Sequence, residues 1–149
     1  MNEVKLKDKN FEIFINEKEI NDIISNISNC INESGIVNPL FIAILNGSFL
    51  FAADLMRKIN IPDTEISFLK LSSYDGLSTT GNVNKLIGLS KKIEGRNVIV
   101  LEDIIDTGIT LEKIISLLEK EKVNSIKIAT LLFKPNSYQK KFQIDYIGT

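Results

Sequence analysis

The stretch VIVLEDIIDTGITL, Val98 to Leu111, decides the predicted fold of this chain. Its first four residues are apolar and predict a buried strand, because a parallel strand that is covered on both faces shows a continuous apolar run. Glu102 and Asp103 stand where this strand should end. From Leu111 onward, apolar residues recur at the spacing of a helix. A strand, an acidic turn and a helix in this order are typical of an α/β fold.

A short polar loop, residues 106–110, joins this strand to the helix. The N-terminus of a helix presents free backbone N–H groups and the positive end of the helix dipole, and both attract phosphate. Ligands collect outside the carboxyl ends of strands in open α/β sheets, so Glu102 and Asp103 are candidates to bind a polyol or a metal ion. The same pattern also fits an ordinary turn in which Asp106 or Thr107 only caps the helix. The local residues leave both interpretations open.

A second stretch repeats this order of elements. The apolar residues Leu40 to Leu45 predict another buried strand, and an apolar helical segment runs from Phe49 to Ile59. Between them lies the short loop Asn46, Gly47 and Ser48. We expect the two loops to face one cleft at the same edge of the sheet. An ordinary strand-to-helix turn with Ser48 as the N-cap is the alternative.

The remaining segments complete the pattern of an α/β protein. Further strands are predicted for Glu65 to Leu71, Lys85 to Leu89 and Ser125 to Phe133. Asn16 and Glu19 have the spacing of a capping box, which predicts the start of a helix. We therefore expect a mostly parallel sheet with helices on both faces. A flavodoxin-like receiver domain is the alternative fold, but it needs an early strand that ends in a phosphoacceptor aspartate, and LFIAILNGS supplies none.

Length and composition indicate one globular domain over residues 1–149 in the cytoplasm. The 18 Lys and Arg residues nearly balance 19 Asp and Glu residues, so no nucleic acid or membrane surface is expected as the main partner. No apolar run approaches the roughly 18 residues that a membrane span needs. The chain has no histidine and one cysteine, Cys30, which excludes histidine catalysis and the usual zinc sites. We expect Cys30 to be a packing residue.

The order of motifs resembles that of the type I phosphoribosyltransferases. The stretch EDIIDTG is similar to the signature of the hypoxanthine-guanine branch, whereas the adenine branch typically has Ala where Asp106 stands. The stretch LNGSFLFAADL is similar to the pyrophosphate loop of the family, in which the peptide bond before Asn46 can be cis. Ser73 and Tyr74, in a loop of small and polar residues, match the Ser-Tyr pair of the flexible active-site loop. Lys134 matches the lysine that donates to the exocyclic oxygen of the purine.

The resemblance implies a type I phosphoribosyltransferase-like fold, which is Rossmann-like, and a role in purine salvage. The reaction transfers the phosphoribosyl group of phosphoribosyl pyrophosphate to hypoxanthine or guanine, with adenine as the competing substrate. Asp106 would be the catalytic base, and Glu102 and Asp103 would hold the ribose hydroxyls, directly or through Mg²⁺. The other residues that the resemblance assigns to substrate binding are Asn46, Gly47, Ser48, Ser73, Tyr74, Thr107, Gly108, Ile109, Thr110 and Lys134. It also implies a homodimer or homotetramer.

This chain departs from the family pattern at three places. Many members carry Lys or Arg at Asn46 and often Lys at Ile109, so backbone N–H groups must do more of the anion binding here. The stretch IDYIG near Thr149 matches the start of a strand that leads, in the family, into a hood over the purine. We therefore expect a domain that is C-terminally truncated relative to the family, with impaired turnover and with Tyr146 and Ile147 exposed at a sheet edge. A non-catalytic module that binds phosphoribosyl pyrophosphate, or a pseudoenzyme, is the alternative function.

Overall fold

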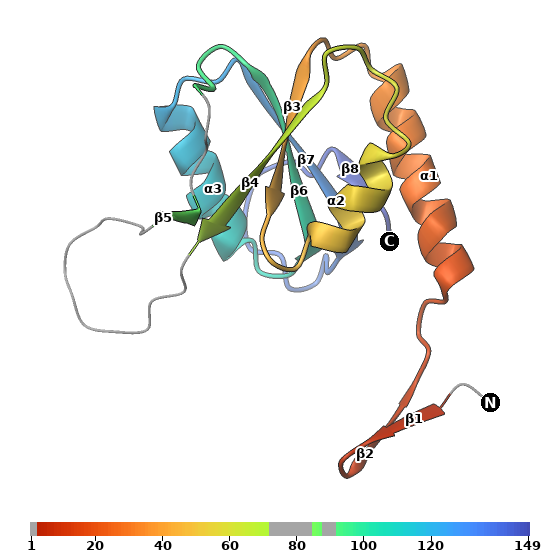
Figure 1. Ribbon diagram of the computed structural model, residues 1–149. Helices are drawn as coiled ribbons and strands as arrows, with labels where there is room; N and C mark the ends of the chain where they lie inside the picture. Colours follow the sequence, from red (N-terminus) through yellow and green to blue (C-terminus); the bar gives the residue numbers. More distant parts are fainter. Residues whose placement is uncertain (1–2, 72–84, 88–91) are drawn as a thin grey trace, which may run out of the picture.

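The computed structural model describes residues 3–71, 85–87 and 92–149. Eleven helices and strands lie in these ranges (Figure 1). In chain order they are β1 (Glu3–Leu6), β2 (Lys9–Glu12), α1 (Glu17–Glu33), β3 (Pro39–Ile44), α2 (Phe49–Met56), β4 (Glu65–Leu71), β5 (Lys85–Ile87), β6 (Asn97–Ile105), α3 (Ile109–Lys120), β7 (Ser125–Phe133) and β8 (Tyr146–Ile147). Among these described residues, no helix is both long and apolar enough to cross a bilayer.

Six strands form one sheet in the order β5-β4-β3-β6-β7-β8. Only β5 runs antiparallel to its neighbour; the pairs from β4 to β8 are parallel. Helices α1 and α2 cover one face of the sheet, and α3 covers the other (Figure 1). The predicted α/β fold with a mostly parallel sheet between helices is confirmed. The strands β1 and β2 form a separate hairpin that projects away from this body (Figure 1).

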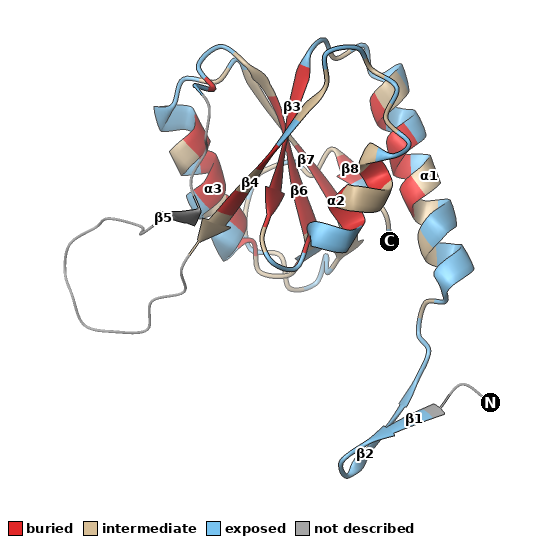
Figure 2. Cartoon of the chain, in the orientation of Figure 1, coloured by how far each residue is buried: buried red, intermediate tan, exposed pale blue. Residues whose placement is uncertain are grey.

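Each central strand contributes side chains to both faces of the sheet. In β6, Val98 and Val100 pack with the apolar side of α3, whereas Ile99 and Leu101 pack with α1 and α2. All six residues of β3 are buried, which explains why its sequence is continuously apolar (Figure 2). These two strands are fixed on both faces and form a rigid support for the loops that follow them.

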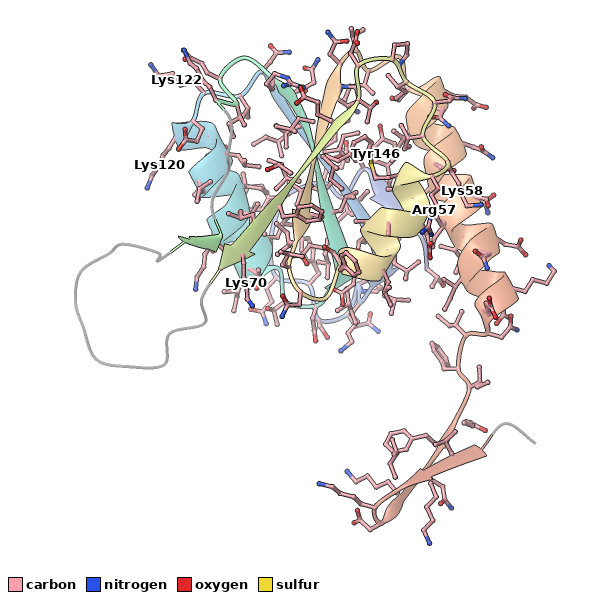
Figure 3. All side chains as sticks on the ribbon, in the orientation of Figure 1. Arg57, Lys58, Lys70, Lys120, Lys122 and Tyr146 are labelled. Carbon is pink, nitrogen blue, oxygen red and sulfur yellow. The ribbon has the colours of Figure 1, made fainter. Side chains whose placement is uncertain are left out.

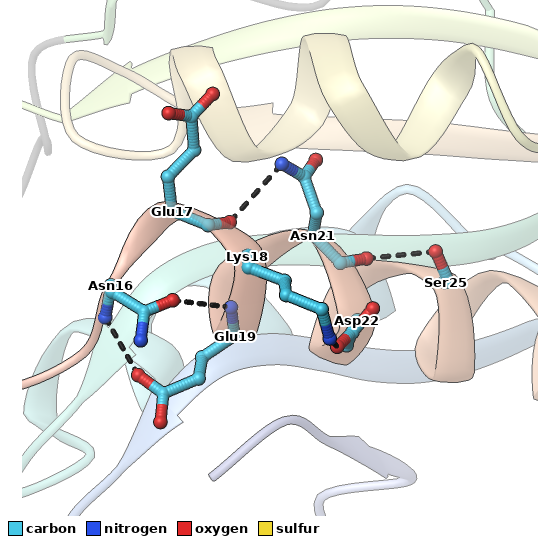
Figure 4. Close-up of polar contacts among 7 residues, drawn as sticks. All are labelled: Asn16, Glu17, Lys18, Glu19, Asn21, Asp22 and Ser25. Carbon is cyan, nitrogen blue, oxygen red and sulfur yellow. Dashed lines mark hydrogen bonds and ion pairs between the residues drawn. The ribbon is translucent and has the colours of Figure 1, made fainter.

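The predicted capping box begins α1 (Figure 4). The Asn16 side chain accepts a hydrogen bond of 3.0 Å from the Glu19 backbone N–H, and the Glu19 carboxylate accepts one of 2.7 Å from the Asn16 N–H. The pair satisfies two backbone donors that a helix N-terminus leaves free. This helix start is therefore encoded locally and was readable from the sequence.

The strand β6 is longer than the apolar run Val98 to Leu101 predicted, because it continues through Ile105. Its pairing with β3 stops at Leu101, but its pairing with β7 continues to Ile105 and Phe133. Glu102 and Asp103 thus lie inside the last part of the strand and not beyond its end. The side of β6 that β3 leaves unpaired is open to the loop after β3.

Tyr146 is buried, which corrects the prediction that it is exposed at the sheet edge. Its strand pairs with β7, and its ring joins the apolar cluster beneath α1 and α2 (Figure 3 labels this residue). The Lys127 ammonium lies 5.6 Å from the ring centroid. Ile147 points the other way and is exposed, as predicted. Successive side chains of a strand point to opposite faces of the sheet, which explains why Tyr146 is buried and Ile147 is exposed.

Candidate functional site

A cavity of about 280 Å³ lies at the carboxyl ends of the central strands. Ile44 lines it from the end of β3, Leu45 and Gly47 line it from the loop that follows, and residues 102–111 line it from the end of β6 to the start of α3. The expectation that the two loops face one cleft is confirmed. Lys120 and Lys122, labelled in Figure 3, lie at the opposite end of α3.

Glu102 and Asp103, at the end of β6, differ in how far their side chains are buried. Glu102 is only 8% exposed, whereas Asp103 is half-buried and lies against Gly47. A Cβ atom at Gly47 would be 2.6 Å from the Asp103 Oδ2 atom. Glycine is therefore required at this position for the carboxylate to stand where it does.

Burial raises the pKa of Glu102 to about 8, and repulsion from the Asp103 carboxylate adds to the rise. A buried carboxyl with a raised pKa is stabilised in its charged form by a cation or by hydroxyl donors that enter the cavity. The two carboxylates offer the hard oxygen ligands that Mg²⁺ prefers. Within residues 3–71, 85–87 and 92–149, no cluster of three or more His, Cys, Asp or Glu side chains could hold a metal. These donors thus fit an ion that takes its remaining ligands from water and a bound phosphate, as Mg²⁺ commonly does.

The loop before α3 presents its backbone to the cavity. Gly108 occupies the N-cap position with φ +83°, and no side chain caps the helix there. The alternative in which Asp106 or Thr107 is the N-cap residue is therefore wrong. The Ile109 N–H donates a long hydrogen bond of 3.5 Å to the Thr107 hydroxyl. The N–H groups that follow it in the first turn have no partner within the helix, so they can bind an anion beside the exposed Ile109 and Thr110.

Asp106 and Lys134 form an ion pair that the sequence analysis did not predict. The Lys134 Nζ atom donates to Asp106 Oδ2 at 2.9 Å, and this hydrogen bond lowers the pKa of Asp106. Both side chains are about half exposed, at 47% and 53%. The register of β6 and β7, in which Ile105 pairs with Phe133, places the two next residues side by side. Knowledge of that register would have predicted the pair.

The loop after β3 has a different construction. The Leu45–Asn46 peptide bond is cis, as the family resemblance implied, and the Asn46 side chain is exposed. Ser48 is fully buried, and its hydroxyl donates to the Ile44 carbonyl at 2.7 Å. Ser48 stands at the start of α2 but makes no side-chain cap. This hydrogen bond therefore stabilises the turn between Ile44 and Ser48.

Two of the predicted site residues, Ser73 and Tyr74, lie outside the described residues. The sequence analysis in turn missed a segment after β7 that packs against the loop before α3. A Cβ atom at Gly108 would lie 2.6 Å from Tyr138 Cε2, and Lys140 makes a 2.7 Å ion pair with Glu112. This segment, NSYQKK, is polar and without periodicity, so its sequence predicted only a surface loop.

Comparisons with known proteins agree with this geometry. Residues 10–149 match the family described as phosphoribosyl transferase domain. The hypoxanthine-guanine phosphoribosyltransferase of Staphylococcus epidermidis is 40% identical over 140 residues, which are 91% of this chain and 76% of the relative. The hypoxanthine phosphoribosyltransferase of Haemophilus influenzae is 34% identical over 96% of this chain and 82% of its own. A crystal structure of a Bacillus anthracis hypoxanthine-guanine phosphoribosyltransferase superposes with a TM-score of 0.82 at 35% identity, over 93% of this chain and 80% of that one.

Proposed function

Because the chain belongs to the phosphoribosyl transferase family, we propose that it transfers the phosphoribosyl group of phosphoribosyl pyrophosphate to hypoxanthine or guanine. The products are IMP or GMP and pyrophosphate, and the role is purine salvage. The relatives that match most of the chain carry this activity in their names. The observation that carries the proposal is the cavity lined by a helix start, an acidic pair and Asp106, whose carboxylate accepts a hydrogen bond from Lys134.

In the proposed function, the 5′-phosphate and the pyrophosphate of the sugar substrate bind to different loops. Backbone N–H groups of residues 106–110 hold the 5′-phosphate at the start of α3, and Thr107 and Thr110 add hydroxyls. The loop of Asn46, Gly47 and Ser48 receives the pyrophosphate. That loop supplies no cationic side chain, so its backbone dipoles carry the binding.

Glu102 and Asp103 hold the ribose hydroxyls between these two places, directly or through Mg²⁺. Mg²⁺ held by these two carboxylates would supply positive charge that stabilises the pyrophosphate leaving group. The donor set fits this ion because both side chains are carboxylates beside a site for phosphates. Asp103 keeps its place only because Gly47 lacks a side chain.

Asp106 and Lys134 bind the purine. Asp106 accepts the proton on N7 while N9 attacks the anomeric carbon and the bond to pyrophosphate breaks, a general-base role commonly worth 10²–10⁴-fold. Its lowered pKa keeps the carboxylate ionised near neutral pH. Lys134 has three donors and no acceptor, so it favours a 6-oxo over a 6-amino group. When the purine enters, the contact between the two side chains gives way to contacts with N7–H and the 6-oxo group.

A nucleotide-formation assay tests this function. The chain is incubated with phosphoribosyl pyrophosphate, Mg²⁺ and either hypoxanthine or adenine, and the products are separated by chromatography. We expect IMP and pyrophosphate in equal amounts, with far less product from adenine. Binding of phosphoribosyl pyrophosphate by titration calorimetry without any nucleotide would instead make the chain a binding module. No binding up to millimolar ligand would contradict both functions.

We also propose that residues 1–149 form a single domain and that this cytoplasmic protein is a homodimer or a homotetramer. The hairpin of β1 and β2 supports self-association, because Val4, Leu6 and Phe11 expose apolar side chains on it. Light scattering after size-exclusion chromatography measures the mass directly. A monomer at micromolar concentration would contradict the oligomer.

A further inference from the structure

We propose that Lys140 favours phosphate binding at the start of α3 by neutralising Glu112, an acidic residue in the first turn of that helix. The 5′-phosphate site at α3 rests on the proposed function; the ion pair between Lys140 and Glu112 does not. The sequence analysis assigned no role to either residue. Lys140 lies in the segment after β7, residues 134–142, which is called the strap below.

The cavity is acidic, although the proposed ligand carries a phosphate and a pyrophosphate. Glu102, Asp103 and Asp106 line it, and none of the lining residues that the structure describes is Lys or Arg. Glu112 adds a carboxylate in the first turn of α3, beside the N–H groups that are free to bind an anion. An unpaired carboxylate there would repel a phosphate and would itself interact with the positive end of the helix dipole.

Lys140 neutralises this carboxylate at short range. Its Nζ atom donates to Glu112 Oε2 at 2.7 Å, and the Lys140 side chain is only 23% exposed. A partly buried pair is screened less by water and salt than a fully exposed one. Lys113, the next residue of α3, is exposed and lies about 100° further around the helix. The pair of Lys140 and Glu112 has no net charge, so the dipole at the start of α3 can act on an anion.

Contacts between the strap and the loop before α3 place Lys140 at the start of the helix. The Gln139 N–H, one residue before Lys140, donates to the Thr107 carbonyl at 3.1 Å. A Cβ atom at Gly108 would lie 2.8 Å from Lys140 Cγ, so the aliphatic stem of the lysine packs directly on the N-cap residue. The lysine therefore crosses the residue at which α3 begins, and its charge lies at the first turn.

A turn in the strap fixes the backbone around Lys140. The Tyr138 hydroxyl donates to the Phe142 carbonyl at 2.9 Å, across residues 139–141. The Tyr138 ring packs edge-on against Phe133, the last residue of β7, with the ring centroids 5.3 Å apart. Because these contacts already order the strap, the ion pair costs less conformational entropy than one between two flexible segments.

A purely structural role is the alternative, since the pair also ties the strap to α3. If the pair only ties the strap, removing either charge breaks it and has the same effect on phosphate binding. If Lys140 neutralises Glu112, removing the lysine leaves a negative charge, and removing the glutamate leaves a positive one. The two single variants should then change phosphate binding in opposite directions.

The test measures ribose 5-phosphate binding by titration calorimetry in Lys140→Met, Glu112→Gln and the double variant. The control is Lys18→Met, which removes a lysine that pairs with Asp22 at 2.8 Å on α1. We expect Lys140→Met to weaken binding and Glu112→Gln to strengthen it, each roughly 3- to 10-fold, for one charge within about 10 Å, the Debye length at 0.1 M salt. The double variant and Lys18→Met should bind like the wild type. Recovery in the double variant excludes misfolding as the cause of the loss.

Two further measurements sharpen this test. Pyrophosphate, which the proposed function assigns to the loop after β3, should respond less than ribose 5-phosphate to each change at Lys140 or Glu112. Raising the salt concentration should reduce the difference between the two single variants, because salt screens charges near the surface.

Nucleotide formation is measured separately, so the inference and the proposed function can fail separately. If Lys140→Met and Glu112→Gln change ribose 5-phosphate binding in the same direction, or if neither differs from Lys18→Met, the inference is wrong. No binding of ribose 5-phosphate by the wild type up to millimolar ligand would overturn it as well. If the two changes are opposite but the wild type forms no nucleotide, Lys140 acts on a phosphate site and the proposed enzymatic function fails instead.

Discussion

The two loops that face the cavity share an order of elements but differ in construction. The loop after β3 is held by a hydrogen bond to the strand that precedes it, because the buried Ser48 hydroxyl donates to the Ile44 carbonyl. Its neighbour Gly47 leaves the space that the Asp103 carboxylate occupies. After β6, the loop is supported from outside, because Asp106 is held by Lys134 and Gly108 packs on Tyr138. The first loop needs few groups beyond its own residues, whereas the second depends on a segment that follows β7.

This difference indicates a division of tasks. A self-contained loop of backbone dipoles is suited to a ligand that must be released, such as pyrophosphate. A loop supported by a neighbouring segment is suited to chemistry, because a catalytic base that is displaced by about 1 Å from its productive position loses much of its effect. In the proposed function, the loop after β3 handles the leaving group and the loop after β6 handles the reaction.

The largest effect is expected from Asp106→Asn. The amide keeps the size of the side chain but cannot accept the N7 proton, so kcat should fall by about 10² to 10⁴. Steady-state kinetics with hypoxanthine measure the change, with Asp8→Asn in the hairpin turn as the control. Purine turnover equal to that of the wild type would contradict the role of Asp106 as the base. Both loops would then act only in anion binding.

A change in stability with pH is expected from Glu102, which lies between the two loops. Its pKa is about 8 in the folded chain and 4.5 in a solvated one, so the folded state binds the proton more tightly. The free energy of unfolding should therefore fall as pH rises from about 4.5 to 8, by up to roughly 5 kcal/mol at 1.36 kcal/mol per pKa unit. Urea unfolding without metal measures it: Glu102→Gln should flatten the curve, and the exposed Glu119→Gln should not.

Alanine substitutions at Gly108 and Gly47 should have smaller effects, and the two should differ in the free energy of unfolding. Gly108→Ala places a Cβ against the Tyr138 ring at φ +83°, so we expect a loss of about 1–3 kcal/mol in the free energy of unfolding. Gly47→Ala meets only the end of the Asp103 side chain, which can turn away. It should change stability little and weaken phosphoribosyl pyrophosphate binding roughly tenfold. Thermal unfolding and calorimetry distinguish the two, and equal destabilisation by both would contradict the contrast between the loops.

Sequence reasoning found what local chemistry encodes. The apolar runs predicted β3 and β7, the capping box of Asn16 predicted the start of α1, and alternation explains the burial on each face. It missed what depends on register between distant segments. The length of β6 is set by pairing with β7, and the Asp106–Lys134 pair by the same register. Tyr146 was misplaced because its burial depends on the helices above β8.

If each loop binds one end of the sugar substrate, a negative charge added to one loop should weaken the binding of only one part of that substrate. Asn46→Asp and Ile109→Asp each add one negative charge at an exposed position, one to each loop. Titration calorimetry with Mg²⁺ then measures pyrophosphate and ribose 5-phosphate binding separately for both variants. We predict that Asn46→Asp weakens pyrophosphate and Ile109→Asp weakens ribose 5-phosphate, each by roughly tenfold or more, as expected for like charges about 4 Å apart near a protein surface. Equal weakening of both ligands by both variants would contradict the division between the loops.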